Sequence, residues 1–490
     1  MKRREFCKAA IVSAIAATPA YRWKRAAADP GSAKGADIPA IKLDGDQTVI
    51  PTAALKSFTS NFRGQVLTAS DPDYEQARRI WNPMIDRRPA VIARCTGTAD
   101  IQRAVAFCRE REVLAAVRGG GHSFPGYSTC NGGFVIDLSG MRGARVDPMT
   151  RTAQVAGGAW NGDLDWEAQQ YALATPMGNV SHTGVGGLTL GGGYGRLSRL
   201  HGLACDNVIS ADLITADAKL VHVSASENPD LFWAIRGGGG NFGVVSWFEY
   251  RLHPVGPKVL TSELRYAPAQ TRSMLEYYGD YASRAPRELA LGIQVVGEKP
   301  GDRSLVAYFC FFGEPAAGER ILASLRTETK PDQENVKSWD YVQLQKRYDG
   351  PMPSDDTEYM KSGYVDGLTP ALIEALLQER GRVELGLFGG AVADVPATAT
   401  AVAHRRELFQ MAVNAVWRDS SDNDRERAEV HAVWDRLSRF TTGFYANLNV
   451  ADQKSVDDNW GSNRTRLVQL KKQYDPGNFF RLNANIRPAA

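Results

Sequence analysis

A histidine that directly follows three glycines is the residue whose surroundings point most clearly to chemistry. The segment Val117–Ser123 reads Val-Arg-Gly-Gly-Gly-His-Ser, and it overlaps an apolar run, residues 113–118, that predicts a strand. Three glycines after a strand let backbone N–H groups point into a concavity that suits phosphate. His122 would then lie beside the molecule that carries the phosphates. Taken alone, the pattern is as typical of a tight turn with a surface histidine.

A second glycine-dense segment, residues 183–195, reads Thr-Gly-Val-Gly-Gly-Leu-Thr-Leu-Gly-Gly-Gly-Tyr-Gly. This spacing allows the backbone to approach a large planar ligand closely. The interleaved residues Val185, Leu188 and Leu190 are aliphatic, whereas flexible linkers are rich in Gly and Ser. The segment therefore favours a ligand-binding loop over a flexible linker.

Several common nucleotide and metal motifs are excluded. Gly238–Gly243 satisfies the GxGxxG pattern, but it follows a predicted helix (228–235) and precedes a predicted strand (244–252). A dinucleotide fingerprint needs the reverse order. The chain has no GxxxxGK[ST] phosphate loop and no GxSxG elbow. None of its six cysteines forms a CxxC pair and no HExxH occurs, so no metal site is predicted.

The elements that must position these loops change in character along the chain. From about Tyr74 to Pro254 the pattern predicts alternating helices and strands, and all the glycine clusters lie there. From about Pro257 to Tyr445 the clusters vanish, and the pattern predicts a second α+β domain. The predicted strands are 90–95, 113–118, 133–138, 152–156, 208–216, 244–252, 289–296, 304–311 and 382–388. The predicted helices are one that Thr98 caps, 163–171, 228–235, 268–278, 317–324, 370–380, 424–440 and 463–472.

Four ordered motifs resemble those of one family. They are RGGGHSFPGYS (118–128), GVGGLTLGGGYGRLSRLHGLACDN (184–207), ENPDLFWAIRGGGGNFGVV (227–245) and KQYDPGNFFRLNANI (472–486). They are similar to motifs of the berberine-bridge-enzyme-like flavin oxidases of the vanillyl-alcohol-oxidase/PCMH superfamily. The resemblance implies an α+β fold: a PCMH-type FAD-binding domain of two α+β subdomains, and an α+β substrate domain with an antiparallel sheet and helices. The expected ranges are a signal segment (1–28), a linker and N-terminal segment (29–70), the FAD-binding domain (71–256), the substrate domain (257–455) and a C-terminal segment that completes the FAD-binding domain (456–490).

The resemblance also implies how the cofactor is held. His122 falls on the histidine that the family joins to the 8α-methyl carbon of the flavin. Many members add a second bond from a cysteine four residues before the GVGG motif, where this chain has Val180. We therefore expect FAD to be bound covalently through His122 only. The other residues expected to contact FAD are Arg118, Gly119, Gly120, Gly121, Ser123, Gly184, Val185, Gly186, Gly187, Gly191, Gly193, Gly243, Val245 and Asn485.

Catalysis requires a base as well as the flavin. Flavin oxidation sends a hydride to N5 of the flavin, and the substrate hydroxyl or amine must lose a proton. Tyr445-Ala-Asn447 matches the family's Tyr-x-Asn, which places a tyrosine over the flavin. The ordinary pKa of tyrosine is about 10, so Tyr445 can act as the base only where a neighbour stabilises its phenolate. Tyr194 is the expected assistant and His182 an alternative base or substrate contact. The competing interpretation of Tyr445 is an aromatic core residue whose hydroxyl is satisfied.

These residues predict an FAD-dependent oxidoreductase that oxidises a small organic alcohol or amine and passes its electrons to molecular oxygen. Two alternatives remain open. One is a dehydrogenase that uses a quinone or a redox protein as electron acceptor. The other is a flavin-binding protein that does not turn over. The related enzymes oxidise sugars, alkaloids, polyketide-derived alcohols and hydroxy-N-heterocycles, so the resemblance leaves the substrate open.

The N-terminus predicts export. Arg3 and Arg4, followed by Glu5, Phe6 and Lys8, resemble a twin-arginine signal, and the apolar stretch 9–20 is shorter than the ~20 residues that span a bilayer. The alternative is a disordered basic tail. The formal net charge is +3, and residues 1–28 contribute +6 of it (seven basic residues and one acidic), which leaves −3 for the rest. A chain of that charge predicts no nucleic-acid partner, and no other segment predicts a membrane span. The predicted location is the periplasm or the medium.

Overall fold

The computed structural model describes residues 37–448, 456 and 458–489. The predicted signal segment, with Arg3 and Arg4, lies outside the described residues. The first described elements are a hairpin of β1 (Ile38–Ile41) and β2 (Gln47–Ile50), followed by the helix α1 (Thr52–Ser60). No helix in the described part of the chain is long and apolar enough to cross a bilayer.

The first sheet carries the histidine loop at the end of one of its strands. Its order is β3 (Gln65–Leu67), β4 (Val91–Arg94), β6 (Phe134–Asp137) and β5 (Ala115–Arg118), and β4, β6 and β5 are parallel. All four residues of β6 are buried, as expected of a parallel strand covered on both faces. The helix α3 (Thr98–Glu110) connects β4 to β5 and buries Ile101, Ala104, Val105 and Cys108 at helical spacing.

The second sheet is antiparallel and has five strands. Its order is β11 (Leu220–Ser224), β10 (Val208–Ile214), β12 (Val244–Arg251), β8 (Thr152–Ala156) and β7 (Ala144–Asp147). The same region contains β9 (Leu173–Ala174) paired with β13 (His253–Pro254), and the helices α2 (Tyr74–Ala77), α4 (Asn161–Gln169), α5 (Val185–Leu190), α6 (Ser198–His201) and α7 (Pro229–Ile235).

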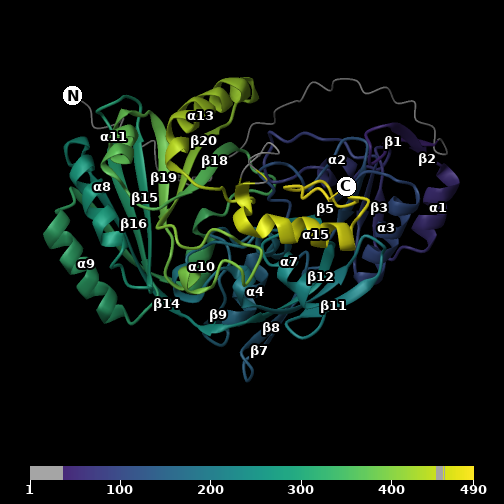
Figure 1. The fold of residues 1–490 in the computed structure, drawn as a ribbon, viewed down its shortest axis with the longest axis horizontal. Helices are drawn as coiled ribbons and strands as arrows, with labels where there is room; N and C mark the ends of the chain where they lie inside the picture. Colours follow the sequence, from purple (N-terminus) through teal and green to yellow (C-terminus); the bar gives the residue numbers. More distant parts are fainter. Residues whose placement is uncertain (1–36, 449–455, 457, 490) are drawn as a thin grey trace. The chain divides into compact units, whose positions relative to one another are not determined.

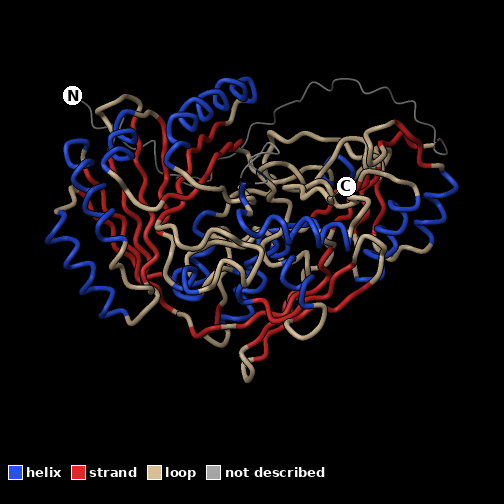
Figure 2. The backbone as a smooth tube through the Cα atoms, viewed as in Figure 1, coloured by secondary structure: helices blue, strands red, loops and turns tan. Residues whose placement is uncertain are grey.

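A seven-stranded antiparallel sheet is formed by residues 258–417. Its order is β17 (Gln333–Asp340), β14 (Lys258–Tyr266), β16 (Ser304–Phe311), β15 (Leu289–Gly297), β19 (Gly381–Leu387), β20 (Phe409–Trp417) and β18 (Thr357–Val365). One face packs its apolar residues against α8 (Pro268–Ala282), α9 (Pro315–Thr329), α11 (Pro370–Gln378) and α13 (Asn423–Leu437), which Figure 1 shows along one side of the sheet. The other face carries polar side chains such as Gln294, Glu384 and Asn414. Loops and short helices lie between this sheet and the five-stranded sheet (Figure 2).

The C-terminal segment returns to the first region through α15 (Arg464–Tyr474), which contacts α7. The buried Lys471 ammonium donates to the backbone carbonyls of Asn241 (2.8 Å) and Phe480 (2.9 Å) and pairs with Asp475 (2.6 Å). Burial lowers the pKa of Lys471 to about 8. The Asp475 carboxylate also accepts the N–H groups of Phe479 and Phe480. The Asp-Pro-Gly-Asn-Phe-Phe motif is therefore a polar clamp that fixes the last segment against the glycine turn at Asn241.

The predicted α+β class is confirmed, and the strands 152–156 and 304–311 have the predicted bounds. Two local predictions were wrong. The residue before α3 is Gly97, so Thr98 is the first helical residue rather than the cap. The glycine-dense segment 183–195 contains the short helix α5 instead of only a loop, because burial of Val185, Thr189 and Leu190 outweighs the poor helix propensity of its glycines.

Candidate functional site

The two glycine-rich segments touch each other through their backbones. A Cβ atom on Gly120 would lie 2.4 Å from the backbone nitrogen of Gly184, and a Cβ on Gly184 would lie 2.2 Å from that of Gly120. A Cβ on Gly186 would lie 2.7 Å from the carbonyl oxygen of Gly157. Any side chain at these positions would push the loops apart. The contact unites both predicted ligand-binding segments in one site and adds Gly157, which the sequence analysis did not identify.

His122 lies against a second histidine in this site. Nε2 of His122 and Nδ1 of His182 are 2.5 Å apart, and the His122 ring stacks on Trp81 with a centroid distance of 4.9 Å and an interplanar angle of 16°. The backbone N–H of Gly350 donates to Nε2 of His182 over 3.4 Å, which leaves Nδ1 of His182 to donate to His122. Burial and the neighbouring His182 lower the pKa of His122 to about 3, and burial also lowers the pKa of His182. Both rings are therefore neutral at pH 7.

The segment that carries His182 is held by the chain after α10 (Tyr341–Gln345). Asp349 accepts hydrogen bonds from the backbone N–H of Ser181 (2.9 Å) and from the Ser181 hydroxyl. Met352 approaches the histidine loop, because its Cε atom would lie 3.5 Å from a Cβ on Gly121. Residues 349–352, which lie between β17 and β18 of the seven-stranded sheet, therefore contact the segments that carry His182 and His122.

The Tyr-x-Asn motif is anchored on the other end of the glycine-rich segment. The hydroxyl oxygen of Tyr445 accepts the backbone N–H of Tyr194 (3.2 Å) and the side-chain amide of Asn447 (2.9 Å). The Asn447 amide also donates to the carbonyl of Leu188 over 3.0 Å. A Cβ on Gly191 would lie 2.2 Å from Oδ1 of Asn447, so glycine is required to seat this asparagine. Burial raises the pKa of Tyr445, while the donors from Asn447 and Tyr194 act to lower it.

Tyr194 and two further aromatic side chains pack beside Tyr445. The Tyr194 hydroxyl donates to the carbonyl of Leu387 over 3.0 Å, and its ring lies 5.4 Å from that of Phe388. Burial raises the pKa of Tyr194 to about 12. Tyr364, which the sequence analysis did not identify because it has no motif, packs against the other side of this cluster, 5.3 Å from the Phe388 ring. Tyr194 therefore packs within this aromatic cluster, and its hydroxyl proton is engaged by the carbonyl of Leu387.

Two other predicted cofactor contacts use their side chains within the protein. The guanidinium of Arg118 pairs with the buried Asp137 (2.5 Å) and donates to the carbonyl of Ala77 (2.6 Å). The Ser123 hydroxyl accepts the backbone N–H of Tyr127 over 2.9 Å. These side chains fix the two ends of the Gly119–Gly121 turn. They therefore position the backbone of this turn, which would contact the ligand.

Two buried polar atoms near the C-terminus fit contact with a nucleotide cofactor. The Oδ1 atoms of Asn483 and Asn485 are buried and have no hydrogen-bond partner among the described residues. An unpartnered buried amide oxygen is costly, so these groups favour a ligand. The nearest atom to a Cβ on Gly240 would be Nδ2 of Asn483, at 4.0 Å, and no atom lies within 4 Å of a Cβ on Gly187. Of the other predicted contacts, Gly193 (φ +81°) and Gly243 (φ +155°) have positive φ, and Val185, Gly186 and Val245 are buried.

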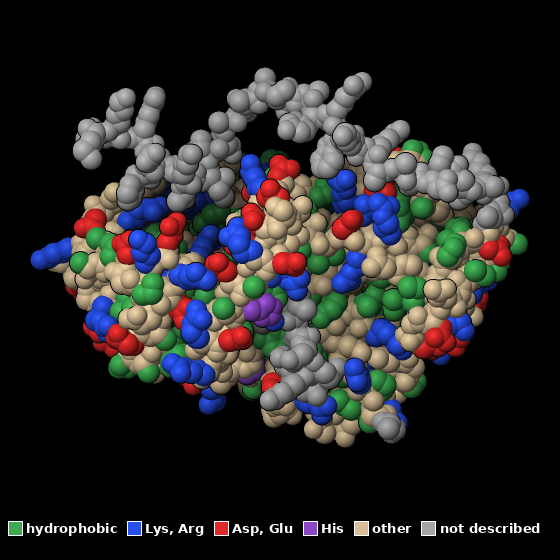
Figure 3. All heavy atoms as spheres, turned by 90° about the horizontal axis from the view of Figure 1, so that it is seen from above, with side chains coloured by type: hydrophobic (Ala, Val, Ile, Leu, Met, Phe, Trp, Pro, Cys, Tyr) green, Lys and Arg blue, Asp and Glu red, His purple; other side chains and the backbone are tan. Residues whose placement is uncertain are grey.

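The described residues contain no cluster of three His, Cys, Asp or Glu side chains that would suit a metal ion. The five described cysteines are free thiols, of which Cys310 is partly exposed and the others are buried. Lys and Arg side chains are interspersed with Asp and Glu on the face shown in Figure 3.

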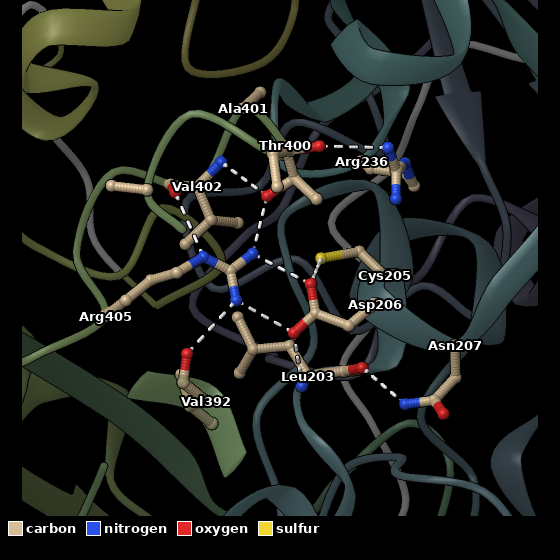
Figure 4. A network of polar contacts seen from close by, with 12 residues as sticks. Leu203, Cys205, Asp206, Asn207, Arg236, Val392, Thr400, Ala401, Val402 and Arg405 are labelled. Atoms are coloured by element: carbon tan, nitrogen blue, oxygen red, sulfur yellow. Dashed lines mark hydrogen bonds and ion pairs between the residues drawn. The ribbon is translucent and has the colours of Figure 1, made fainter. Parts of the chain in front are cut away.

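A buried arginine links the glycine-rich segment to the chain before β20. Arg405 is 1% exposed and donates to both carboxylate oxygens of Asp206 (2.9 and 2.8 Å) and to the Thr400 hydroxyl (2.5 Å), as Figure 4 shows. Asp206 in turn accepts the backbone N–H of Leu203 over 2.9 Å. The pair joins residues 199 positions apart, so it fixes the segment 392–405 beside the motif that carries Tyr194.

Replacing Arg405 by methionine is expected to destabilise the protein by about 3–5 kcal/mol, because Asp206 is left as a buried and unpaired charge. The measurement is the unfolding midpoint of the purified protein. The control is Arg466→Met, which breaks an exposed pair with Asp230 (side chains 44% and 58% exposed) and should cost less than about 1 kcal/mol. Equal unfolding midpoints for the two variants would contradict the structural role of Arg405.

Comparisons with known proteins agree with this geometry. Residues 89–224 match the model of an FAD binding domain, and residues 444–487 match the model described as berberine and berberine like. An FAD-linked oxidoreductase of Dictyostelium discoideum is 31% identical over 458 residues, which cover 91% of this chain and 99% of the relative. The solved 6-hydroxy-D-nicotine oxidase of Arthrobacter nicotinovorans is similar with a TM-score of 0.78 and 27% identity, over 87% of this chain and 98% of the other. The xylooligosaccharide oxidase of Myceliophthora thermophila is similar with a TM-score of 0.80 and 25% identity, over 89% and 100%.

Proposed function

Because the chain belongs to the berberine-bridge-enzyme-like family of FAD-linked oxidoreductases, we propose that it oxidises a small organic alcohol or amine and passes the electrons to molecular oxygen. One observation carries this proposal: the segment 182–194 contacts both His122 and Tyr445. At one end, Gly184 and His182 contact the His122 loop, and at the other the N–H of Tyr194 binds the Tyr445 hydroxyl. A cofactor held at His122 would thus be presented to Tyr445. The names of two solved relatives, oxidases of a hydroxynicotine and of a xylooligosaccharide, favour oxygen as the acceptor.

The cofactor would be held by one covalent bond, from His122. Val180 stands at the place of the family's second, cysteine link. The nearest cysteines in sequence, Cys130 and Cys205, are buried among other groups: the Cys130 thiol packs against Gly133, and the Cys205 thiol lies 3.7 Å from the Asp206 carboxylate. Asn485 and the glycine loops would contact the rest of FAD. When bound, FAD supplies the acceptor for the substrate hydride.

Tyr445 is the proposed base. Burial raises the pKa of Tyr445, and the two N–H groups that its oxygen accepts, from Tyr194 and Asn447, partly offset that rise because they stabilise a phenolate more than a neutral phenol. The phenolate would take the proton from the substrate hydroxyl or amine while the hydride leaves the adjacent carbon. His182 is assigned to the His122 contact, which orients the His122 ring.

The function is tested by screening a library of alcohols and amines against the yellow protein without air. A substrate should bleach the flavin absorbance, and readmitted oxygen should restore the colour and yield hydrogen peroxide. Bleaching without peroxide, with reoxidation by a quinone, would replace the oxidase by a dehydrogenase. A flavin that no compound in the library bleaches would favour a protein that binds the cofactor without turnover.

We also propose that the protein is exported in folded form through its twin-arginine segment. Replacing Arg3 and Arg4 by lysine keeps the charge but removes the paired guanidinium groups. The variant is expected to accumulate in the cytoplasm with its flavin bound, as measured by cell fractionation and flavin fluorescence. Normal export of this variant would contradict the proposal.

A further inference from the structure

Two glycines leave space on the face of the seven-stranded sheet that lies opposite its covering helices (Figure 1). Gly292 of β15 and Gly386 of β19 are paired there, and both are partly exposed. Apart from its chain neighbours, the described residues place only one atom within 4 Å of a Cβ on Gly292, the Cβ of Tyr308 at 4.0 Å. A Cβ on Gly386 would lie 3.1 Å from the hydroxyl oxygen of Tyr194, whose N–H binds the Tyr445 hydroxyl. The space above these glycines therefore borders the proposed site of oxidation.

Gln410 lies beside this space with an unpaired hydrogen-bond donor. In the register of the sheet it is between Gly386 on β19 and Tyr364 on β18. Its neighbours Phe409 and Met411 belong to the core under the helices, so Gln410 points to the opposite face, on which the glycines lie. Gln410 is 8% exposed, and its Nε2 atom is buried without a hydrogen-bond partner among the described residues. Because an unpaired buried donor is costly, this amide favours a ligand that supplies an acceptor.

Asn414 presents an unpaired acceptor farther along the same strand. It lies four residues after Gln410 on the same face of β20, about 14 Å away at the usual rise of a strand. Asn414 is 6% exposed, and its Nδ2 atom donates to Oε1 of Glu358 over 3.3 Å. Its Oδ1 atom is buried and has no hydrogen-bond partner in the described part of the chain. This face therefore holds a free amide donor near Tyr194 and a free amide acceptor farther from it.

The charged groups on the same face are paired or only partly ionised. Glu384 accepts a hydrogen bond from the Gln294 amide (3.0 Å) and pairs with Arg382 (2.5 Å). The Tyr308 hydroxyl donates to Oε1 of Gln294 over 3.0 Å. Burial raises the pKa of Glu358 to about 7, with a further contribution from Glu384, so this carboxyl is only partly ionised at pH 7. None of these described side chains is therefore a fully ionised carboxylate that lacks a partner and could hold an ammonium ion.

We propose that the substrate is a neutral polyol of sugar type that is longer than one six-membered ring. Its reacting end lies over the two glycines, where one of its hydroxyls accepts the N–H of Gln410, and a distal hydroxyl donates to Asn414. A hydroxyl both donates and accepts, so it satisfies both free amide groups, whereas an ammonium ion offers no acceptor to Gln410. The inference rests on the proposed function and narrows its substrate from an alcohol or amine to a polyol. Gln410 and Asn414 are then residues that determine specificity.

A panel of matched compounds tests the substrate class on the wild-type protein without air. The polyols are glucose, cellobiose, maltose and sorbitol, the amines are benzylamine and spermidine, and benzyl alcohol carries a single hydroxyl. At least one disaccharide should bleach the flavin with a lower KM than glucose, its one-ring unit, and the amines and benzyl alcohol should not bleach it. Bleaching by an amine or by benzyl alcohol, but by no polyol, would overturn the inference and leave the proposed function intact. A KM for glucose as low as that for the disaccharides would also overturn it. Failure of the proposed function itself would be seen separately, as a flavin that neither this panel nor the wider library bleaches.

Two variants then test the residues, with the disaccharide that bleaches the flavin and with glucose. Asn414→Leu keeps the shape of the side chain but removes the acceptor, so the KM for the disaccharide should rise about 5- to 100-fold more than the KM for glucose. Gln410→Met removes the donor beside Tyr194 and should raise both KM values. The control is Asn335→Leu, at an exposed position on the edge strand β17, which should keep both at the wild-type values. Asn414→Leu values that stay at wild type, or that change equally for both sugars as a structural loss would, overturn the assignment.

Discussion

Replacing His122 by alanine is expected to abolish covalent attachment of FAD. His122 is the imidazole where the two glycine segments meet, and its pKa of about 3 keeps the ring neutral at pH 7. Without the bond, the loops and Asn485 should hold FAD loosely or not at all. The measurement is the flavin fluorescence of acid-precipitated protein, which should persist in the wild type and fall to background in the variant.

The matched control is His222→Ala. His222 pairs with Asp212 (2.8 Å), and its side chain is 44% exposed, so its loss should leave the covalent flavin unchanged. Covalent flavin that survives in His122→Ala would move the attachment to another residue. Complete release of flavin from the denatured wild type would show that no covalent bond exists.

Replacing Tyr445 by phenylalanine is expected to slow flavin reduction by about 100- to 10,000-fold, the usual contribution of a general base. The ring keeps its packing, so folding and flavin content should stay near the wild-type level. The Asn447 amide keeps its bond to the carbonyl of Leu188 (3.0 Å), which preserves the backbone around Gly191. The measurement is anaerobic stopped-flow reduction with the substrate found by bleaching.

Tyr171→Phe is the control, because Tyr171 is 51% exposed and lies outside the site. It should reduce its flavin at the wild-type rate. A Tyr445→Phe loss confined to KM would mean that Tyr445 only positions the substrate. An unchanged rate in this variant would remove Tyr445 from proton transfer.

The family and its PCMH-type α+β fold were predictable from the sequence, and both are confirmed. The signals are local: glycines cluster where the chain must approach a ligand, and apolar residues recur with the period of their element. The strand 304–311, whose buried residues alternate along much of its length, could be delimited to the residue.

Contacts between residues that are distant in the sequence could not be predicted. The pairing of His122 with His182 and that of Arg405 with Asp206 depend on how segments fold back together, and no spacing encodes them. Strands β14, β17, β18 and β20 were not predicted, and in β17 and β18 polar or aromatic residues on the open face obscure the apolar pattern.

We expect this oxidoreductase to carry one FAD, bonded to His122. The most direct test is the intact mass of the denatured wild-type protein, followed by mapping of its flavin-bearing peptide. The expected result is the mass of the chain plus one FAD less two hydrogens, with a single modified peptide that contains His122. A mass without flavin, or a flavin on a peptide that lacks His122, would contradict it.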